Sequence, residues 1–143
     1  MRMLFDSTIT RLRAADRNTR LEALLDYSRK LRDLPASLQA AGDRDAHLVA
    51  ECQTPVYLWA EVHQGKVALH ADAPREAPTV RGFLALLQSR VNGASPADVA
   101  AIPSDLLDQL GIAELLGMTR THGLTAVLIR IKRLVAGVAG LSR

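Results

Sequence analysis

Two runs of alternating apolar and polar residues, separated by a tight turn, most constrain the fold of this chain. In the first run, one face carries Val56, Leu58, Ala60 and Val62, and the other carries Tyr57, Trp59 and Glu61. In the second run, one face carries Val67, Leu69 and Ala71, and the other carries Lys66, Ala68, His70 and Asp72. The intervening HQGK contains Gly65, which adopts positive φ at little cost. The pattern predicts an antiparallel β-hairpin over residues 56–72.

Helical periodicity on both sides of this hairpin indicates what covers it. Apolar residues spaced three and four apart predict helices over residues 19–34, 80–91 and 121–136. The residues expected to face the core are Leu21, Leu24, Leu25, Leu31, Leu34, Val80, Phe83, Leu84, Leu87, Val91, Leu124, Val127, Leu128, Ile131 and Val135. Pro35 is expected to stop the first helix. Helices that flank a small antiparallel β-sheet make an α+β fold.

Shorter segments connect these elements between residues 92 and 121. Ser95 precedes Pro96, and Ser104 precedes a leucine-rich run, so both serines are expected to be N-caps of short helices. Gly111 and Gly117 are expected to separate the segments that follow.

The size of the chain predicts one domain. At 143 residues it is close to the most common domain length, so we expect a single domain over residues 1–143. Residues 1–18 form an N-terminal segment for which helical and flexible states are both open. No apolar run approaches the roughly 18 to 20 residues that cross a bilayer, and the start lacks a signal peptide. We therefore expect a cytoplasmic protein without membrane contact.

The net charge of +3 raises the question of nucleic-acid binding. Acidic residues are interleaved with most of the basic ones, and two Phe, two Tyr and one Trp leave little for a surface on which bases stack. We expect a solvated basic surface and no nucleic-acid partner.

Cys52 is the only cysteine and lies in the stretch ECQTPVYLW. A single cysteine excludes an internal disulfide, a zinc site built from cysteines and an iron–sulfur cluster held by this chain alone. Pro55 disfavours helix in Thr54, so the thiol is expected in a loop before the first strand. A free cysteine is usually a small buried residue, but polar neighbours make poor core companions. Glu51 would oppose ionisation of the thiol if it lay close to it, and we predict a thiol that is not strongly activated in the free protein.

Three stretches of the chain resemble the SufE family of cysteine desulfuration proteins. They are VAECQTPVYLWAEVHQGKVALHADAP, TVRGFLALL and LGIAELLGMTRTHGLTAVLIRIKR. The resemblance rests on Cys-Gln-Thr before the first strand, on Val-x-Gly at Val80 to Gly82, and on Arg-x-x-Gly at Arg120 to Gly123. It implies a SufE/IscU-like fold.

The resemblance also implies a function. A family member is an accessory protein, not an independent enzyme, and it stimulates a cysteine desulfurase that depends on pyridoxal phosphate (PLP). Cys52 would take sulfane sulfur from a SufS-like desulfurase and pass it to an iron–sulfur scaffold containing SufB. The PLP belongs to the desulfurase, so no cofactor and no metal are expected on this chain. Whether the protein is a monomer or a homodimer stays open.

The same resemblance suggests residues that contact the partner. They are Glu51, Gln53, Thr54, Asp72 and Arg120. The chain departs from the family pattern at DAPREAPTV, residues 72–80, and at Glu51, where many relatives have glycine. Arg120 is open to two interpretations, a contact with the desulfurase or Cys52 loop and an ordinary surface arginine.

Two other classes of function remain as alternatives. A one-cysteine redox enzyme would need a cation beside Cys52 and a depressed thiol pKa. A scaffolding or nucleic-acid-binding module would not depend on Cys52. The histidines His47, His63, His70 and His122 have no metal-binding spacing and are expected as surface or strand residues.

Overall fold

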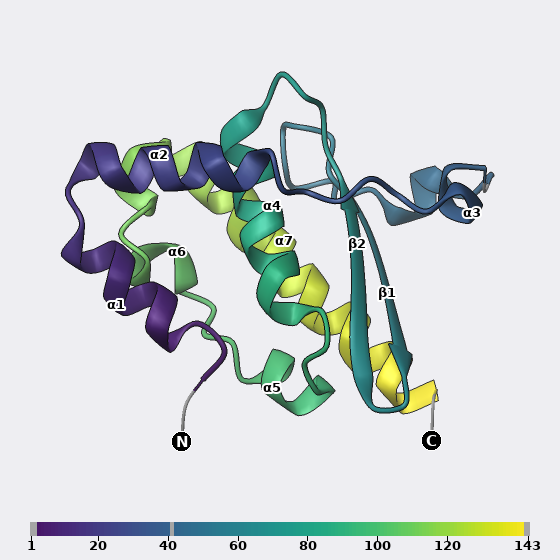
Figure 1. The fold of residues 1–143 in the computed structure, drawn as a ribbon. Coiled ribbons are helices and arrows are strands. Elements are labelled where there is room, and N and C mark those ends of the chain that lie inside the picture. Colours follow the sequence, from purple (N-terminus) through teal and green to yellow (C-terminus); the bar gives the residue numbers. More distant parts are fainter. Residues whose placement is uncertain (1–2, 41, 142–143) are drawn as a thin grey trace.

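The computed structural model describes residues 3–40 and 42–141 and has the α+β architecture that the sequence predicts. Its helices are α1 (Asp6–Ala14), α2 (Arg17–Ser28), α3 (Ala36–Gln39), the 3-10 helix η1 (Arg44–His47), α4 (Pro78–Val91), α5 (Pro96–Ala100), α6 (Leu106–Gln109) and α7 (Ala113–Leu141). The strands β1 (Tyr57–His63) and β2 (Lys66–Asp72) form a two-stranded antiparallel sheet. In Figure 1 the hairpin lies along one side of α4 and α7, and α2 crosses α4 on the other side.

The hairpin confirms the first prediction. Tyr57 pairs with Asp72 at its open end and His63 with Lys66 at its turn. Gln64 and Gly65 both have positive φ, 53° and 77°, which is the backbone of a two-residue type I′ turn. The predicted inner face of β2 is buried, and it packs on α4, while β1 packs on α7.

Trp59 differs from the expectation for the outer face of β1. Only 5% of this residue is exposed, although it lies on the face that the alternation assigns to solvent. His47 from η1 stacks on the indole with ring centroids 4.9 Å apart. The η1 segment therefore covers the outer face of β1, and periodicity within the strand cannot reveal a cover supplied by another segment.

The helix predicted over residues 19–34 is too long at its C-terminal end. Helix α2 ends at Ser28, well before Pro35, which therefore does not stop it: the N–H groups of Arg29 and Lys30 already bond to carbonyls three residues back. Further on, the Arg32 N–H donates to Gln88 Oε1 on α4 (3.2 Å). Leu31 and Leu34 remain buried, at 7% and 8% exposure, but they reach the core from irregular backbone. Leu21 is 36% exposed, so its assignment to the core is wrong.

The other helices agree with the sequence in part. Helix α4 closely matches the predicted 80–91, and the Ser95 hydroxyl accepts a hydrogen bond from the Asp98 N–H as predicted. Ser104 is not an N-cap, because Asp105 takes that position before α6 and makes no side-chain capping bond. The last helix is longer than the predicted 121–136 and is kinked at Gly117 (φ 80°, ψ 168°).

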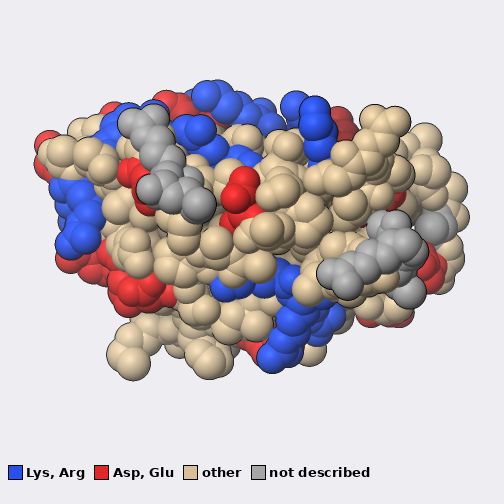
Figure 2. Space-filling view, turned by 90° about the horizontal axis from the view of Figure 1, so that it is seen from below, with Lys and Arg blue, Asp and Glu red and all other residues tan. Residues whose placement is uncertain are grey.

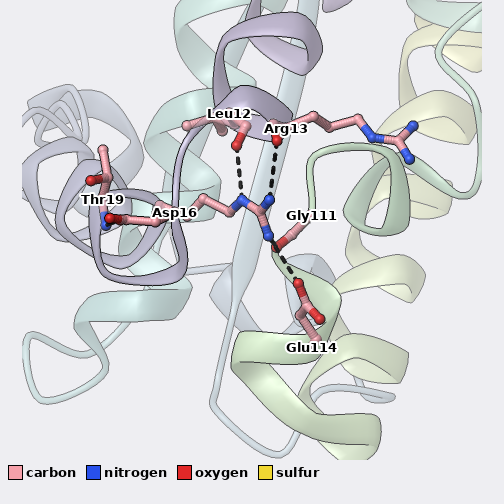
Figure 3. A network of polar contacts seen from close by, with 7 residues as sticks. Leu12, Arg13, Asp16, Thr19, Gly111 and Glu114 are labelled. Atoms are coloured by element: carbon pink, nitrogen blue, oxygen red, sulfur yellow. Dashed lines mark hydrogen bonds and ion pairs between the residues drawn. The ribbon is translucent and has the colours of Figure 1, made fainter.

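The N-terminal segment is helical over α1, and its Phe5 and Leu12 join the core. Arg20 on α2 fixes the end of this helix (Figure 3). Its guanidinium donates to the carbonyls of Leu12 (2.8 Å), Arg13 (3.2 Å) and Gly111 (3.2 Å), and it pairs with the Glu114 carboxylate at 2.9 Å. One side chain thus ties α1 to the start of α7.

The described residues share one apolar core, to which the helices α1, α2, α4, α5, α6 and α7 and both strands contribute. In the part of the chain that the structure describes, no helix is long and apolar enough to cross a membrane.

Candidate functional site

Cys52 lies in a loop that is closed at its base by backbone hydrogen bonds. The Val49 N–H donates to the Val56 carbonyl (2.8 Å), and the Cys52 N–H donates back to the Val49 carbonyl (3.3 Å). The loop enters β1 directly, and Leu48 bridges Tyr57 at the first residue of the strand. The hairpin therefore holds the loop at its base, while residues 50–55 project from it, as the sequence predicted for the thiol.

Helix α7 supplies the surface against which Cys52 rests. A Cβ added to Gly123 would lie 3.2 Å from Cys52 Cα and 3.3 Å from Sγ, closer than ordinary van der Waals contact. A side chain at this position would push the Cys52 loop away from α7 by a few tenths of an ångström, so glycine allows the closest approach. Gly123, the last residue of the Arg-x-x-Gly motif, thus lies against Cys52. This contact was not predicted from the sequence.

The half-buried thiol opens into a pocket of about 240 Å³. The pocket is lined by Cys52, Gln53, Thr54, Leu116, Thr119 and Arg120. Gln53, Thr54 and Arg120 were predicted site residues, and the fold brings all three to the cysteine. Leu116 and Thr119 were not predicted to belong to the site. The sequence signal that could have pointed to them is Gly117, which lies between them and at which α7 is kinked.

The remaining predicted residues lie elsewhere. Glu51 is exposed and does not line this pocket. Asp72 lies in a separate hollow that shares no lining residue with the Cys52 pocket, and it pairs with Arg44 at 2.6 Å. Asp72 is therefore already neutralised by a partner within this chain.

Burial raises the pKa of the Cys52 thiol above its ordinary value, because desolvation disfavours the thiolate. The Thr54 backbone N–H and the positive charge of Arg120 act in the opposite direction, with smaller effects. This agrees with a thiol that is not strongly activated. It disfavours a one-cysteine peroxidase, which depends on a depressed thiol pKa.

The charge of Arg120 gives a testable pH dependence. Because Arg120 lowers the pKa of Cys52, Arg120→Met is expected to raise that pKa further and to slow alkylation by about twofold at neutral pH. Only the thiolate reacts, so the rate falls as pH decreases, and the inflection of the variant should lie at higher pH than in the wild type. Iodoacetamide kinetics against pH measure this. Arg120→Lys keeps the charge and should shift the inflection less, whereas a Met variant that reacts like the wild type would contradict the assignment.

The face of the molecule shown in Figure 2 has no single continuous basic patch. Basic and acidic side chains both occur there, in separate groups among uncharged residues. Within residues 3–40 and 42–141, no group of three or more His, Cys, Asp or Glu side chains is arranged to hold a metal ion. His47 is bound to the Leu58 carbonyl and stacked on Trp59, and His63 pairs with Glu61.

Comparison with known proteins agrees with this geometry. The model of the SufE family, the Fe-S metabolism associated domain, matches residues 6–135. This chain belongs to the SufE family. The resemblance noted from its sequence is thereby confirmed.

Relatives of the SufE family align with most of the chain. A SufE-like protein of Mycobacterium tuberculosis is 37% identical over 115 residues, which are 80% of this chain and 78% of that protein. The sulfur acceptor protein CsdE of Escherichia coli is 33% identical over 106 residues, 73% of this chain and 68% of CsdE. The solution structure of a hypothetical protein from Thermus thermophilus has a TM-score of 0.83 at 30% identity and covers 96% of both chains. The fold is therefore SufE-like.

Proposed function

We propose that this SufE-family protein accepts sulfur on Cys52 from a PLP-dependent, SufS-like cysteine desulfurase. It then delivers the sulfur to an iron–sulfur scaffold that contains SufB. The observation that carries the proposal is that the only cysteine of a SufE-family chain opens into a pocket beside Arg120. The sulfur-acceptor role of the relative CsdE supports it. The protein acts as an accessory carrier that stimulates the desulfurase, and the whole chain acts as one domain.

The proposed transfer is an exchange between two sulfur–sulfur bonds. The Cys52 thiolate attacks the terminal sulfur of the persulfide on the desulfurase, which forms a new S–S bond on Cys52. The S–S bond of the donor breaks, its electron pair stays on the donor cysteine as a thiolate, and no external oxidant is needed. Such attack depends on both thiolate fraction and nucleophilicity, and the best attacking thiol has a pKa near ambient pH. Burial raises the pKa of Cys52 and keeps its thiolate fraction low in the free protein, so a contact with the partner that lowers this pKa would speed the attack.

The single cysteine favours a carrier over a reductase. A second thiol in the same chain would attack the Cys52 persulfide, form a disulfide and release sulfide. This chain has no second thiol, so the persulfide persists until another protein takes it. The proposed setting is the cytoplasm, where thiols are kept reduced. This chain needs no cofactor or metal for the exchange, because the PLP acts on the desulfurase.

Mass spectrometry tests the proposal. The protein is incubated with a cysteine desulfurase of the same organism, PLP and cysteine, without reductant, and the intact chain and its Cys52 peptide are weighed. We expect the mass of at least one sulfur atom on that peptide, lost on reduction. An unmodified Cys52 peptide beside a desulfurase that does carry persulfide would refute the proposal.

A further inference from the structure

A second hollow, of about 410 Å³, lies at the open end of the hairpin. Four arginines from four separate segments line it, which are Arg32 after α2, Arg44 in η1, Arg75 after β2 and Arg81 in α4. Its carboxylates are Asp33 and Asp72, so four positive and two negative side chains leave an excess of two positive charges. Arginines drawn together from distant parts of the sequence form a local field that charge counting along the chain does not detect.

Two of these arginines are fixed in place. Arg44 binds Asp72 at 2.6 Å and lies 4.0 Å from the centre of the Tyr57 ring, a cation–π contact. Arg81 donates to the Ala73 carbonyl at 2.6 Å and lies 3.9 Å from Asp72. These contacts orient the guanidinium groups before any ligand arrives, so less side-chain entropy is lost on binding.

The other two arginines are available. Arg32 and Arg75 are exposed, and within the described residues neither side chain has a hydrogen bond or ion pair. The backbone of Arg32 is nevertheless held, because its N–H donates to the buried amide of Gln88. A guanidinium group binds a carboxylate through two parallel N–H···O bonds, so the hollow suits carboxylate side chains.

The arginine-lined hollow and the Cys52 pocket lie at the same end of the hairpin, which is at the top in Figure 1. Tyr57 pairs with Asp72 across the sheet, and the loop that carries Cys52 closes one residue before Tyr57. On the other side, Arg120 of the Cys52 pocket donates to Thr79 Oγ1 (3.3 Å) in the first turn of α4, just after the turn that carries Arg75. A protein that reaches Cys52 Sγ therefore approaches the end of the molecule at which the hollow lies.

We propose that the arginine-lined hollow is a docking site for an acidic segment of the sulfur donor. The inference rests on the proposed function. It adds a second, electrostatic contact between this protein and the desulfurase, away from the reacting sulfur. Asp72 serves this site as the anchor of Arg44 rather than as a direct contact with the partner. Arg75 lies in DAPREAPTV, where the sequence departs from the family pattern, between β2 and α4.

The double variant Arg32→Glu with Arg75→Glu tests the inference, because both side chains lack structural contacts. Sulfur gain at Cys52 is followed against the concentration of the acceptor, with the desulfurase of the same organism. We expect half-saturation at about tenfold higher concentration, with an unchanged rate at saturation, because charge reversal weakens encounter but leaves Cys52 intact. Added salt should raise the half-saturating concentration of the wild type and lower that of the variant, because it screens an attraction in the first and a repulsion in the second.

The control is Arg17→Glu with Arg133→Glu, the same charge change at two exposed arginines that do not line this hollow. Circular dichroism confirms folding, and Arg32→Gln with Arg75→Gln should give an intermediate loss. If wild type and charge-reversal variant saturate alike, or if the control pair loses as much, the docking site is overturned while sulfur acceptance stands. If the wild type gains no sulfur, the proposed function falls and this inference with it.

Discussion

Cys52→Ser is expected to abolish sulfur uptake completely and to leave the fold intact. Serine fills nearly the same volume in the loop but has no thiolate, so it cannot form the S–S bond on which transfer depends. The loop closure between Val49 and Val56 uses backbone atoms alone and is unaffected. Mass spectrometry of the charged reaction measures the result, and thermal unfolding measures stability, which should change by less than about 1 kcal/mol.

A relocated thiol provides the matched control for this variant. Cys52→Ser combined with Arg133→Cys places an exposed thiol ten residues beyond Gly123 on α7, about 15 Å along the helix axis. If the loop and its pocket direct the transfer, this second protein should be alkylated readily but gain no sulfur from the desulfurase. Equal charging of the relocated thiol would show that any accessible thiol suffices.

Gly82→Ala is expected to lower the free energy of unfolding by about 3 kcal/mol. Gly82 lies where α4 crosses α2, and an added Cβ would lie 2.1 Å from the Leu24 carbonyl oxygen. The obstacle is backbone, which cannot rotate away as a side chain can, so the two helices must separate. Urea denaturation measures the loss.

Gly137→Ala is the opposite case and serves as the control. Gly137 is also helical, but it is exposed on α7, and nothing lies within 4 Å of an added Cβ. Alanine should stabilise this helix by about 0.5 to 1 kcal/mol, since glycine is the poorer helix former. Equal effects at the two glycines would contradict the close approach of α2 and α4.

The sequence correctly predicted those helices and strands whose own apolar residues repeat along one face and are buried there. The hairpin, α4 and the core side of α7 belong to this class, because each places its own apolar side chains on a common core. The prediction failed where another segment decides the outcome. Trp59 is covered by His47, and the segment after α2 leaves the helical path and bonds to Gln88 on α4 through the N–H of Arg32.

The same distinction applies to the site. Cys52 in a loop followed from Pro55 and from the start of β1, and Arg120 came from the resemblance alone. The contact of Gly123 with the thiol and the gathering of four arginines around one hollow involve residues far apart in the chain. Such juxtapositions depend on tertiary packing, which a single sequence does not reveal.

The guanidinium of Arg20 has a consequence for the order in which the molecule assembles. Two of its acceptors, the Gly111 carbonyl and the Glu114 carboxylate, lie 91 and 94 residues away in sequence. The loop that these contacts close carries a large entropic cost during folding. The contacts of Arg20 with Leu12 and Arg13 lie within one short stretch of chain, whereas those with Gly111 and Glu114 require the start of α7 to be in place. The connection between the N-terminal helices and α7 is therefore expected to be among the last parts of this fold to form.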